Sequence, residues 1–296
     1  MNIVITGSSG FLGKHLSMHL SKKYDLVELD RMKLAQQISH NKINNFDVII
    51  HCAARAHVMK EDSLQSWEKY CKSNIKLTID IAKNAALNGA KRFIFISSLK
   101  VNGEKTDKFP FKASDPRNPL CHYSKSKALA EQELIKIGQQ SGMEIVIIRP
   151  PLVYGKGVKA NFGRLFNLVS KQLPLPFASI KYNRRSLVSV YNLVDLIDEC
   201  IENPNAANEI FLVSDDNDLS TERMIRIMGE VLNKRLFLIP IPLSFFKLIG
   251  RVLNKSDLID RLTDSLQADI SQTKSKLNWK PPFSVRSGFF KCRNGD

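Results

Sequence analysis

Short apolar runs alternate with longer amphipathic stretches through the first half of the chain. The apolar runs have the length of buried β-strands and fall at residues 2–6, 25–29, 47–51, 92–97 and 144–149. The amphipathic stretches, with apolar residues three and four apart as in a helix with one buried face, are 11–22, 66–89 and 124–140. Strands alternating with helices are typical of βαβ units. The pattern therefore predicts an α/β protein with a Rossmann-like, doubly wound parallel sheet.

The pattern loosens after the Pro-Pro pair at residues 150–151. The later elements are a strand at 186–190, a helix at 192–202 and a strand at 209–213. We expect residues 185–215 to return to the sheet of a first domain, 1–155. Residues 156–184 and 216–296 would then form a smaller C-terminal lobe, and ligands in such folds bind at the carboxyl edge of the sheet.

A glycine-rich turn, TGSSGFLG at residues 6–13, joins the first strand to the first helix. Gly7, Gly10 and Gly13 stand where the backbone must turn tightly, and Phe11 and Leu12 open the helix. The N–H groups at a helix N-terminus can bind a pyrophosphate if the backbone can approach closely. Glycines alone could mark a simple turn, but the order of strand, turn and helix predicts that residues 1–155 bind a dinucleotide.

Two charged residues follow the second strand and bear on the choice of dinucleotide. Asp30 lies 17 residues after Gly13, where a carboxylate accepts from the adenosine ribose hydroxyls and repels a 2′-phosphate. This favours NAD. Arg31 would instead pair with a 2′-phosphate if it points inward, so NADP stays open.

Tyr123 and Lys127 lie one helical turn apart in the segment YSKSK. A phenol titrates near 10, and a neighbouring ammonium together with an oxidised nicotinamide would lower this pKa enough for proton transfer to or from an alcohol. Ser98, at the end of the 92–97 strand, could hydrogen-bond the reacting oxygen. Without the dinucleotide turn, the tyrosine and lysine would be ordinary helix-surface residues and the serine a strand-end cap.

Composition narrows the class of protein. The chain has 296 residues, 43% of them hydrophobic and 25% charged, which fits a globular protein and excludes disorder, collagen and coiled coil. Its five cysteines are scattered without a CxxC pair, so we expect neither a disulfide framework nor a metal site. The first residues lack the cationic and apolar regions of a signal peptide, so the expected location is cytoplasmic.

A formal net charge of +15 favours polyanions, membrane surfaces or small anionic ligands. No block of basic and aromatic residues and no finger spacing occurs, so we expect no nucleic-acid partner. The most apolar stretch, 236–253, has nearly the length of a membrane span but contains Pro240, Pro242, Lys247 and Arg251. We interpret it as a buried loop and helix without stable membrane insertion, with peripheral membrane contact as the alternative.

Several segments together resemble the extended short-chain dehydrogenase/reductases, within them the NAD-dependent nucleotide-sugar epimerases, dehydratases and ketoreductases. They are TGSSGFLG (6–13), HCAA (51–54), SNIKLT (73–78), FISSLKVNG (95–103), YSKSK (123–127), RPPLVYG (149–155), RRSLVSV (184–190) and LNWKPP (277–282). The resemblance implies a catalytic triad of Ser98, Tyr123 and Lys127. It also implies a cofactor site lined by Ala53, Ala54, Asn74 and Pro150, and a substrate diphosphate bound by Arg185, with Asn161 and Arg261 in the same region.

The chain also departs from this family. Sugar 4,6-dehydratases of the group carry Asp-Glu after the catalytic hydroxyl, where this chain has Leu99 and Lys100. Asn102 replaces the tyrosine of a motif written VYG. The span between Asp30 and Asp47 is short, which predicts that a third strand there is truncated or absent.

The resemblance therefore implies an NAD(P)-dependent enzyme acting at C4 of a nucleotide-linked hexose. The substrate would be UDP-linked, as UDP-N-acetylhexosamine or its 6-deoxy-4-keto derivative, and a homodimer stays open. Epimerase and ketoreductase are not separated. Two hypotheses from other classes are a non-catalytic dinucleotide sensor or scaffold, against which the intact triad argues, and a basic polyanion-binding protein.

Overall fold

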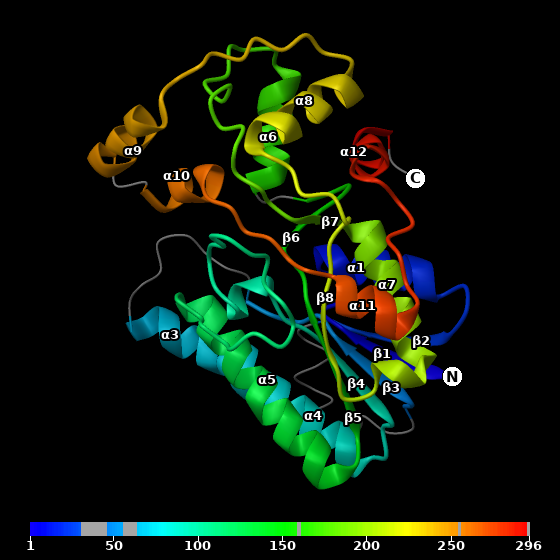
Figure 1. The fold of residues 1–296 in the computed structure, drawn as a ribbon. Helices are drawn as coiled ribbons and strands as arrows, with labels where there is room; N and C mark the ends of the chain where they lie inside the picture. The colour runs from blue at the N-terminus through cyan, green and yellow to red at the C-terminus, as the bar shows by residue number, and fades with distance from the viewer. Residues whose placement is uncertain (31–45, 56–63, 159–160, 254–255, 295–296) are drawn as a thin grey trace.

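The computed structural model describes residues 1–30, 46–55, 64–158, 161–253 and 256–294. At its centre, six parallel strands follow the order β2-β1-β3-β4-β5-β8 (Figure 1). They are β1 (Asn2–Thr6), β2 (Asp25–Leu29), β3 (Val48–His51), β4 (Arg92–Ile96), β5 (Glu144–Arg149) and β8 (Ile210–Leu212). The doubly wound parallel sheet is confirmed. The predictions about Arg31 and a third strand after it fall on residues 31–45, outside the described residues.

Helices cover both faces of the sheet because successive strand residues point to opposite sides. On one face, Ile3 and Ile5 pack with residues of α1 (Phe11–Leu20) and α7 (Val190–Glu202), and α11 (Ser271–Leu277) lies on the same side (Figure 1). On the other face, Val4 packs with α4 (Leu77–Leu87) and α5 (His122–Ser141). These two apolar cores hold the carboxyl ends of the strands in one row.

The amphipathic stretch at 66–89 forms three consecutive helical pieces. They are α3 (Leu64–Tyr70), a π-helical turn (Cys71–Lys76) and α4. A π turn is wider than an α turn, and such turns are frequent at functional sites. This one contains the fully buried Asn74.

The strand expected at 186–190 does not join the main sheet, which corrects the prediction for part of 185–215. It forms β7 (Leu187–Ser189), which pairs in parallel with β6 (Leu152–Tyr154) in a separate two-stranded sheet. The reason lies in the Pro150-Pro151 pair, because prolines have no N–H with which to continue the β5 ladder. Of the segment 185–215, β8 is the strand that pairs with β5.

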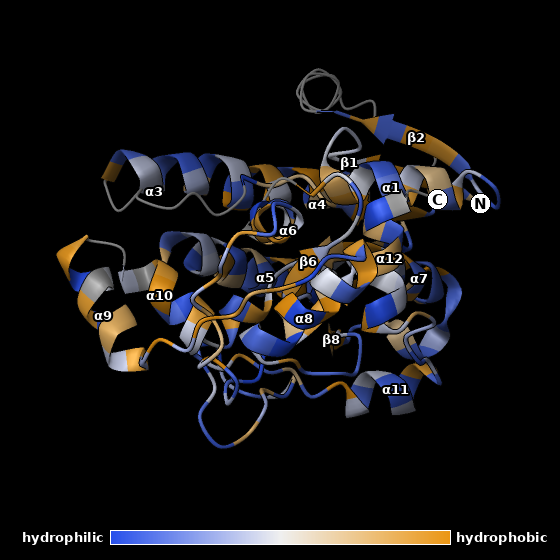
Figure 2. Ribbon diagram, turned by 90° about the horizontal axis from the view of Figure 1, so that it is seen from above, coloured by the Kyte–Doolittle hydropathy of each residue, from blue (hydrophilic) through white to orange (hydrophobic). Residues whose placement is uncertain are grey.

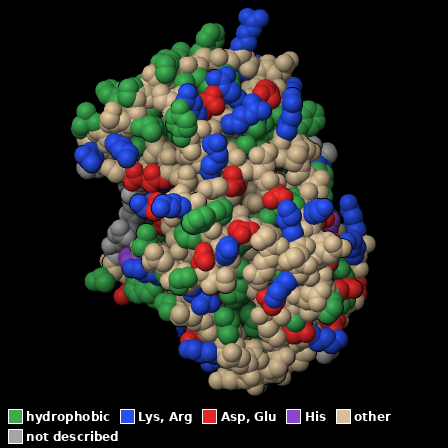
Figure 3. Space-filling view, viewed as in Figure 1, with side chains coloured by type: hydrophobic (Ala, Val, Ile, Leu, Met, Phe, Trp, Pro, Cys, Tyr) green, Lys and Arg blue, Asp and Glu red, His purple; other side chains and the backbone are tan. Residues whose placement is uncertain are grey.

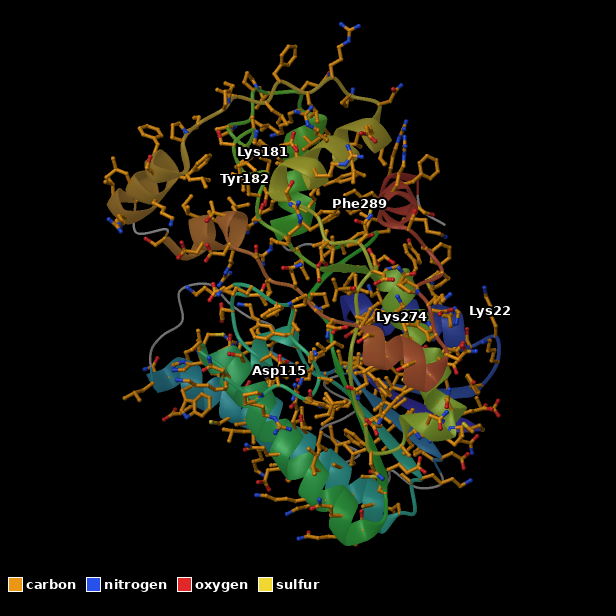
Figure 4. The ribbon with its side chains drawn as sticks, viewed as in Figure 1. Lys22, Asp115, Lys181, Tyr182, Lys274 and Phe289 are labelled. Carbon is orange, nitrogen blue, oxygen red and sulfur yellow. The ribbon has the colours of Figure 1, made fainter. Side chains whose placement is uncertain are left out.

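A third apolar core builds the C-terminal lobe. Tyr154, Phe162 and Phe289 pack their rings together, with centroids 4.8 to 5.1 Å apart. Figure 4 marks Phe289 on α12. The helices around this core are α6 (Asn161–Ser170), α8 (Thr221–Leu232) and α12 (Val285–Asn294).

Two further helices, α9 (Leu243–Val252) and α10 (Ser256–Thr263), lie at the outer edge of the lobe (Figures 1 and 2). We expected 236–253 to be buried, and this is wrong for one side of the segment. Phe237, Phe245, Leu248 and Val252 are exposed, because α9 packs on the lobe with one face only. In the described part of the chain, no helix is long and apolar enough to span a bilayer.

Candidate active site

The turn after β1 can close only because it contains glycines. Gly7 has a φ of +74°, and a Cβ at this position would lie 2.7 Å from the backbone nitrogen of Ala53. A Cβ on Gly13 would lie 2.2 Å from the carbonyl oxygen of Gly7. Both distances are too short for non-bonded atoms. The glycines therefore bring the turn against the first turn of α1 and leave its backbone bare.

Helix α1 begins at Phe11 with its N-terminus at this turn. Its N-cap is Gly10, no side chain caps it within the described residues, and its first turn has no acidic residue. The first N–H groups of a helix have no partner inside the helix and carry partial positive charge. The N–H groups of Phe11 and Leu12 would therefore hold the diphosphate of a dinucleotide, and the residues present fit such a cofactor.

The ends of β2 and β3 border the same turn. The N–H of Gly7 donates to the carbonyl of Leu29 at 2.8 Å, which places the half-buried Asp30 beside the glycines. On the other side, the N–H of Ala53 donates to the Thr6 hydroxyl at 3.4 Å, and Ala54 follows. Asp30, Ala53 and Ala54 therefore lie where an adenosine half would bind.

The side chain of Asn74 is hydrogen-bonded within the protein and does not face an open site. Its Oδ1 accepts from the N–H of Arg55 at 2.7 Å, and its Nδ2 donates to the Arg55 carbonyl and to Ser126 Oγ. The amide is thus engaged within the protein. Asn74 positions the segment that carries Ala53 and Ala54 against α5.

His51, the last residue of β3, hydrogen-bonds the end of β1 at the turn. Its two ring nitrogens lie 2.7 Å from Thr6 Oγ1 and 2.9 Å from Thr78 Oγ1. Burial, with a smaller contribution from Lys127, lowers the pKa of His51 to about 3. The ring is therefore neutral at physiological pH and links β1, β3 and α4.

Ser98, Tyr123 and Lys127 meet at the carboxyl end of β4. Ser98 follows this strand, and its hydroxyl hydrogen-bonds the Tyr123 phenol. Lys127 lies one turn after Tyr123 on α5 and donates from Nζ to the carbonyl of Ile96 at 2.7 Å. The structure thus brings the three residues together. The Nζ ammonium of Lys127 has two further N–H groups, which could donate hydrogen bonds to a bound cofactor.

The environment sets the protonation of this pair. Burial raises the pKa of Tyr123 to about 12, Cys121 adds to the rise, and the hydrogen bond with Ser98 opposes it. Burial lowers the pKa of Lys127 to about 8, against the attraction of Cys52 and Glu131. In the cofactor-free chain at neutral pH the phenol is protonated and most of the lysine is charged. A further positive charge beside Tyr123 would be needed to make it a base.

A buried ion pair lies directly under these residues. Glu131, fully buried on α5, accepts from Arg149 Nη2 at 2.6 Å and Nε at 2.9 Å, and from Ser97 Oγ at 2.6 Å. Arg149 also donates to Asn102 Oδ1 at 3.0 Å. This contact explains Asn102, for which the sequence offered no account, as a partner of the buried guanidinium.

The lobe adds two guanidinium groups to the site. Arg185 is held by backbone hydrogen bonds with Leu219, and its Nη1 donates to the carbonyl of Asp264 at 2.9 Å. Burial lowers the pKa of Arg185 to about 10; Asp264 opposes this, and the nearby charge of Arg261 on α10 adds to it. Arg185 therefore remains cationic at pH 7. The preceding Arg184 is exposed and donates to backbone carbonyls of its own loop.

Glu104 is a half-buried carboxylate that interacts with Lys100, Cys121 and Arg261. Its carboxylate lies 3.0 Å from Lys100 Nζ and hydrogen-bonds Cys121. Burial would raise the pKa of Glu104, but Lys100, Cys121 and Arg261 outweigh it and lower the value. One carboxylate oxygen, Oε1, is buried without a hydrogen-bond partner in the described structure. Sequence reasoning missed Glu104, and its spacing of four from Lys100 was the available signal.

Two expected site residues lie at element boundaries. Pro150 directly follows β5 and is buried, and its carbonyl accepts from the N–H of Leu99 at 2.9 Å, which fixes the end of β5 beside Ser98. Asn161 is the first residue of α6, and its side chain lies outside the described residues. Across the described ranges, no group of three His, Cys, Asp or Glu could hold a metal ion.

A doubly wound sheet, a glycine turn under an open helix N-terminus, and a Ser-Tyr-Lys group beside it define a dinucleotide-dependent enzyme. The model of the NAD dependent epimerase/dehydratase family matches residues 3–214, and the chain belongs to this family. Membership confirms the expected relationship and NAD as the cofactor.

Relatives extend over nearly the whole chain. It is 46% identical to a UDP-glucose 4-epimerase of Vibrio cholerae, over 97% of this chain and 93% of that protein. It is 25% identical to the N-acetyl-α-D-glucosaminyl-diphospho-ditrans,octacis-undecaprenol 4-epimerase of Escherichia coli O157:H7, over 97% and 92%. The fold matches the structure of a UDP-glucose 4-epimerase from Thermotoga maritima with a TM-score of 0.79, at 20% identity over 98% and 96% of the chains.

Proposed function

We propose that the protein is a nucleotide-sugar 4-epimerase that inverts C4 of a UDP-linked hexose. The observation that carries this proposal is the group of Ser98, Tyr123 and Lys127 at the sheet edge, where Ser98 is hydrogen-bonded to Tyr123 and Lys127 lies one turn further along α5. The name of the Vibrio cholerae relative supports the position of the reaction.

Tyr123 would take the proton from the sugar O4 and later return it, and Ser98 would hold that oxygen by a hydrogen bond. Bound NAD supplies the group that accepts and returns the hydride. Lys127 would stabilise the phenolate of Tyr123, because its ammonium lies on the same helix face one turn away. The apolar layer under β4 limits access of water from the sheet side.

Arg185 and Arg261 would bind the substrate diphosphate. Both side chains come from the lobe, and the charge of Arg261 contributes to the lowered pKa of Arg185. Like charges repel, so a diphosphate between the two guanidinium groups would relieve that repulsion and accept forked hydrogen bonds. The sugar would then extend from the diphosphate toward Tyr123.

The sugar itself is proposed to be an N-acetylhexosamine. The name of the Escherichia coli relative contains an N-acetylglucosaminyl group, whereas that of the Vibrio cholerae relative contains glucose. The unpartnered Oε1 of Glu104 is a buried acceptor for a sugar hydroxyl or amide N–H. A dehydratase is not proposed, because Leu99 is buried and Lys100 is paired with Glu104, which leaves no acid and base at those positions.

Product analysis tests the proposal. The protein is incubated with UDP-glucose and with UDP-N-acetylglucosamine, with and without added NAD or NADH. An epimerase returns the C4 epimer without net change in cofactor. Stoichiometric oxidation of NADH with a 4-keto sugar, and no epimer from any UDP-sugar, would establish a ketoreductase instead. Binding of NAD without any turnover would support a sensor or scaffold.

A further inference from the structure

The edge of the lobe around α9 presents apolar side chains to solvent. Phe237 and Ile239 are exposed in the segment before the helix, and Phe245, Leu248 and Val252 are exposed on it, Val252 to 73%. Figure 3 shows hydrophobic side chains on the upper left of the molecule, where Figure 1 places α9. Exposed apolar patches of this kind mark contact surfaces. We call these five residues the α9 surface.

The backbone forces these side chains outward. The 237–239 segment pairs with Leu175 through two hydrogen bonds of 2.8 Å, so Phe237 and Ile239 point one way and Leu238 packs on the lobe core. This is the alternation expected of extended chain. The outward position is therefore built into the pairing of the loop.

The opposite side of α9 is firmly attached. Phe246 stacks on Phe177 with ring centroids 6.2 Å apart. A Cβ on Gly250 would lie 2.8 Å from the Ile259 side chain, so α9 approaches α10 closely at that point. At about 100° per residue, Phe245, Leu248 and Val252 form a stripe roughly opposite this attached side. The helix presents a fixed apolar face and needs no rearrangement to do so.

The charged residues on α9 and in the segment just before it are all basic, while the nearest acidic residues, such as Asp260, lie on α10. Lys247 and Arg251 are exposed on a second stripe beside the apolar one, and Lys234 and Arg235 are exposed just before Phe237. The sequence from 231 to 256 contains no Asp or Glu. Apolar side chains rimmed by basic ones match the acyl boundary and headgroups of an anionic bilayer.

We propose that the α9 surface docks the protein peripherally on anionic lipid bilayers. A groove of about 500 Å³ next to it offers space for part of an acyl chain, lined by Pro240, Ile241, Pro242, Ser244, Phe245 and Leu248. Because α10 follows α9 directly and carries Arg261, docking would bring the proposed diphosphate site near the membrane surface. The proposal does not depend on which sugar is the substrate.

Co-sedimentation of the whole protein with vesicles tests this. Binding is expected to vesicles that contain phosphatidylglycerol, weakly or not at all to pure phosphatidylcholine, and to fall at high salt. Lys247→Glu with Arg251→Glu should weaken binding at least about 25-fold, because each basic residue near an anionic surface contributes about fivefold. Phe245→Glu with Leu248→Glu should abolish it.

The matched control carries the same charge change elsewhere. Lys22→Glu with Lys83→Glu reverses two exposed lysines; Lys22 lies far from α9 (Figure 4), and this variant should keep at least half of the binding. Circular dichroism and turnover of soluble UDP-sugar should remain unchanged in all variants. No binding of the wild type to either vesicle would overturn the proposal. So would equal losses in the control, or a dimer in solution that the Phe245 and Leu248 variant dissociates, since a second copy would then cover the surface.

Discussion

Replacing Glu131 by glutamine should destabilise the protein strongly, although the two side chains have nearly the same shape. Arg149 is 1% exposed, and two of its hydrogen bonds end on the Glu131 carboxylate. Glutamine keeps one acceptor oxygen, turns an N–H₂ group toward the guanidinium, and leaves Arg149 charged without a buried counter-ion. Removing one partner of a buried pair costs about 3 to 5 kcal/mol. Arg117, also bound to Glu131, can turn to solvent and adds little.

Urea unfolding of four proteins measures the effect. The wild type, Glu131→Gln, Arg149→Met and the double variant form a cycle that isolates the coupling between the two side chains. The double variant should be more stable than the sum of the single losses predicts, by at least about 2 kcal/mol. A loss below about 1 kcal/mol for Glu131→Gln, or strictly additive losses, would refute the reasoning.

The same variant should change catalysis in a defined direction. Glu131 lies one turn after Lys127 on α5 and raises its pKa. Loss of the carboxylate would lower the pKa of Lys127 below about 8, so that less of it is charged at neutral pH. The pH profile of kcat should therefore shift toward lower pH. A purely structural loss of folded protein would lower the activity without moving the profile.

Tyr123→Phe should keep NAD affinity while turnover falls by at least about 10²-fold; near-native turnover on the best substrate would exclude Tyr123 as the acid and base. Asp30→Ala should narrow the preference for NAD over NADP in a titration of both cofactors, because the carboxylate repels a 2′-phosphate, and a wild type that binds NADP more tightly would contradict this. Arg185→Lys should raise KM more than it lowers kcat, by about 1.5 to 3 kcal/mol in binding, and loss of UDP affinity in Arg184→Ala alone would move the contact by one residue. Asp215→Asn should change how stability depends on pH. Burial raises the pKa of Asp215 to about 6, so the wild type gains stability relative to the variant as pH falls from 7 to 4, by about 2.4 kcal/mol. Parallel stability curves for the two proteins would argue against that pKa.

The sheet was predictable because its central strands, such as β3 and β4, are apolar on both faces. The predicted bounds of β1, β2 and β5 match the structure to the residue. A strand between two helical layers has a nearly continuous apolar sequence, as β1 and β5 do, and the shorter apolar run of the edge strand β2 was enough to predict it. The Tyr123 and Lys127 pair was equally predictable, because a spacing of four on a helix fixes their proximity without any tertiary information.

Other features depend on contacts between distant segments and could not be predicted. The partner of β7 is β6 because two prolines divert the chain, and a local pattern does not show which sheet a strand joins. The role of Asn102 requires Arg149, 47 residues later, to be buried beside it. The exposure of the α9 surface depends on which face of α9 the lobe covers, and apolar composition alone suggested burial.

The neutral ring of His51 implies that acid acts unequally on the two parts of the molecule. Below pH 6.5 the His51 ring takes up a proton in the unfolded chain but not in the folded dinucleotide-binding domain. This difference lowers the stability of the domain by about 1.4 kcal/mol per pH unit, down to about pH 3. Asp215, joined to Tyr154 in the lobe by a 2.6 Å hydrogen bond, has the opposite effect over part of this range. Mild acid should therefore open the sheet around the cofactor turn before the lobe, and hydrogen exchange at β1 and β3 should accelerate first.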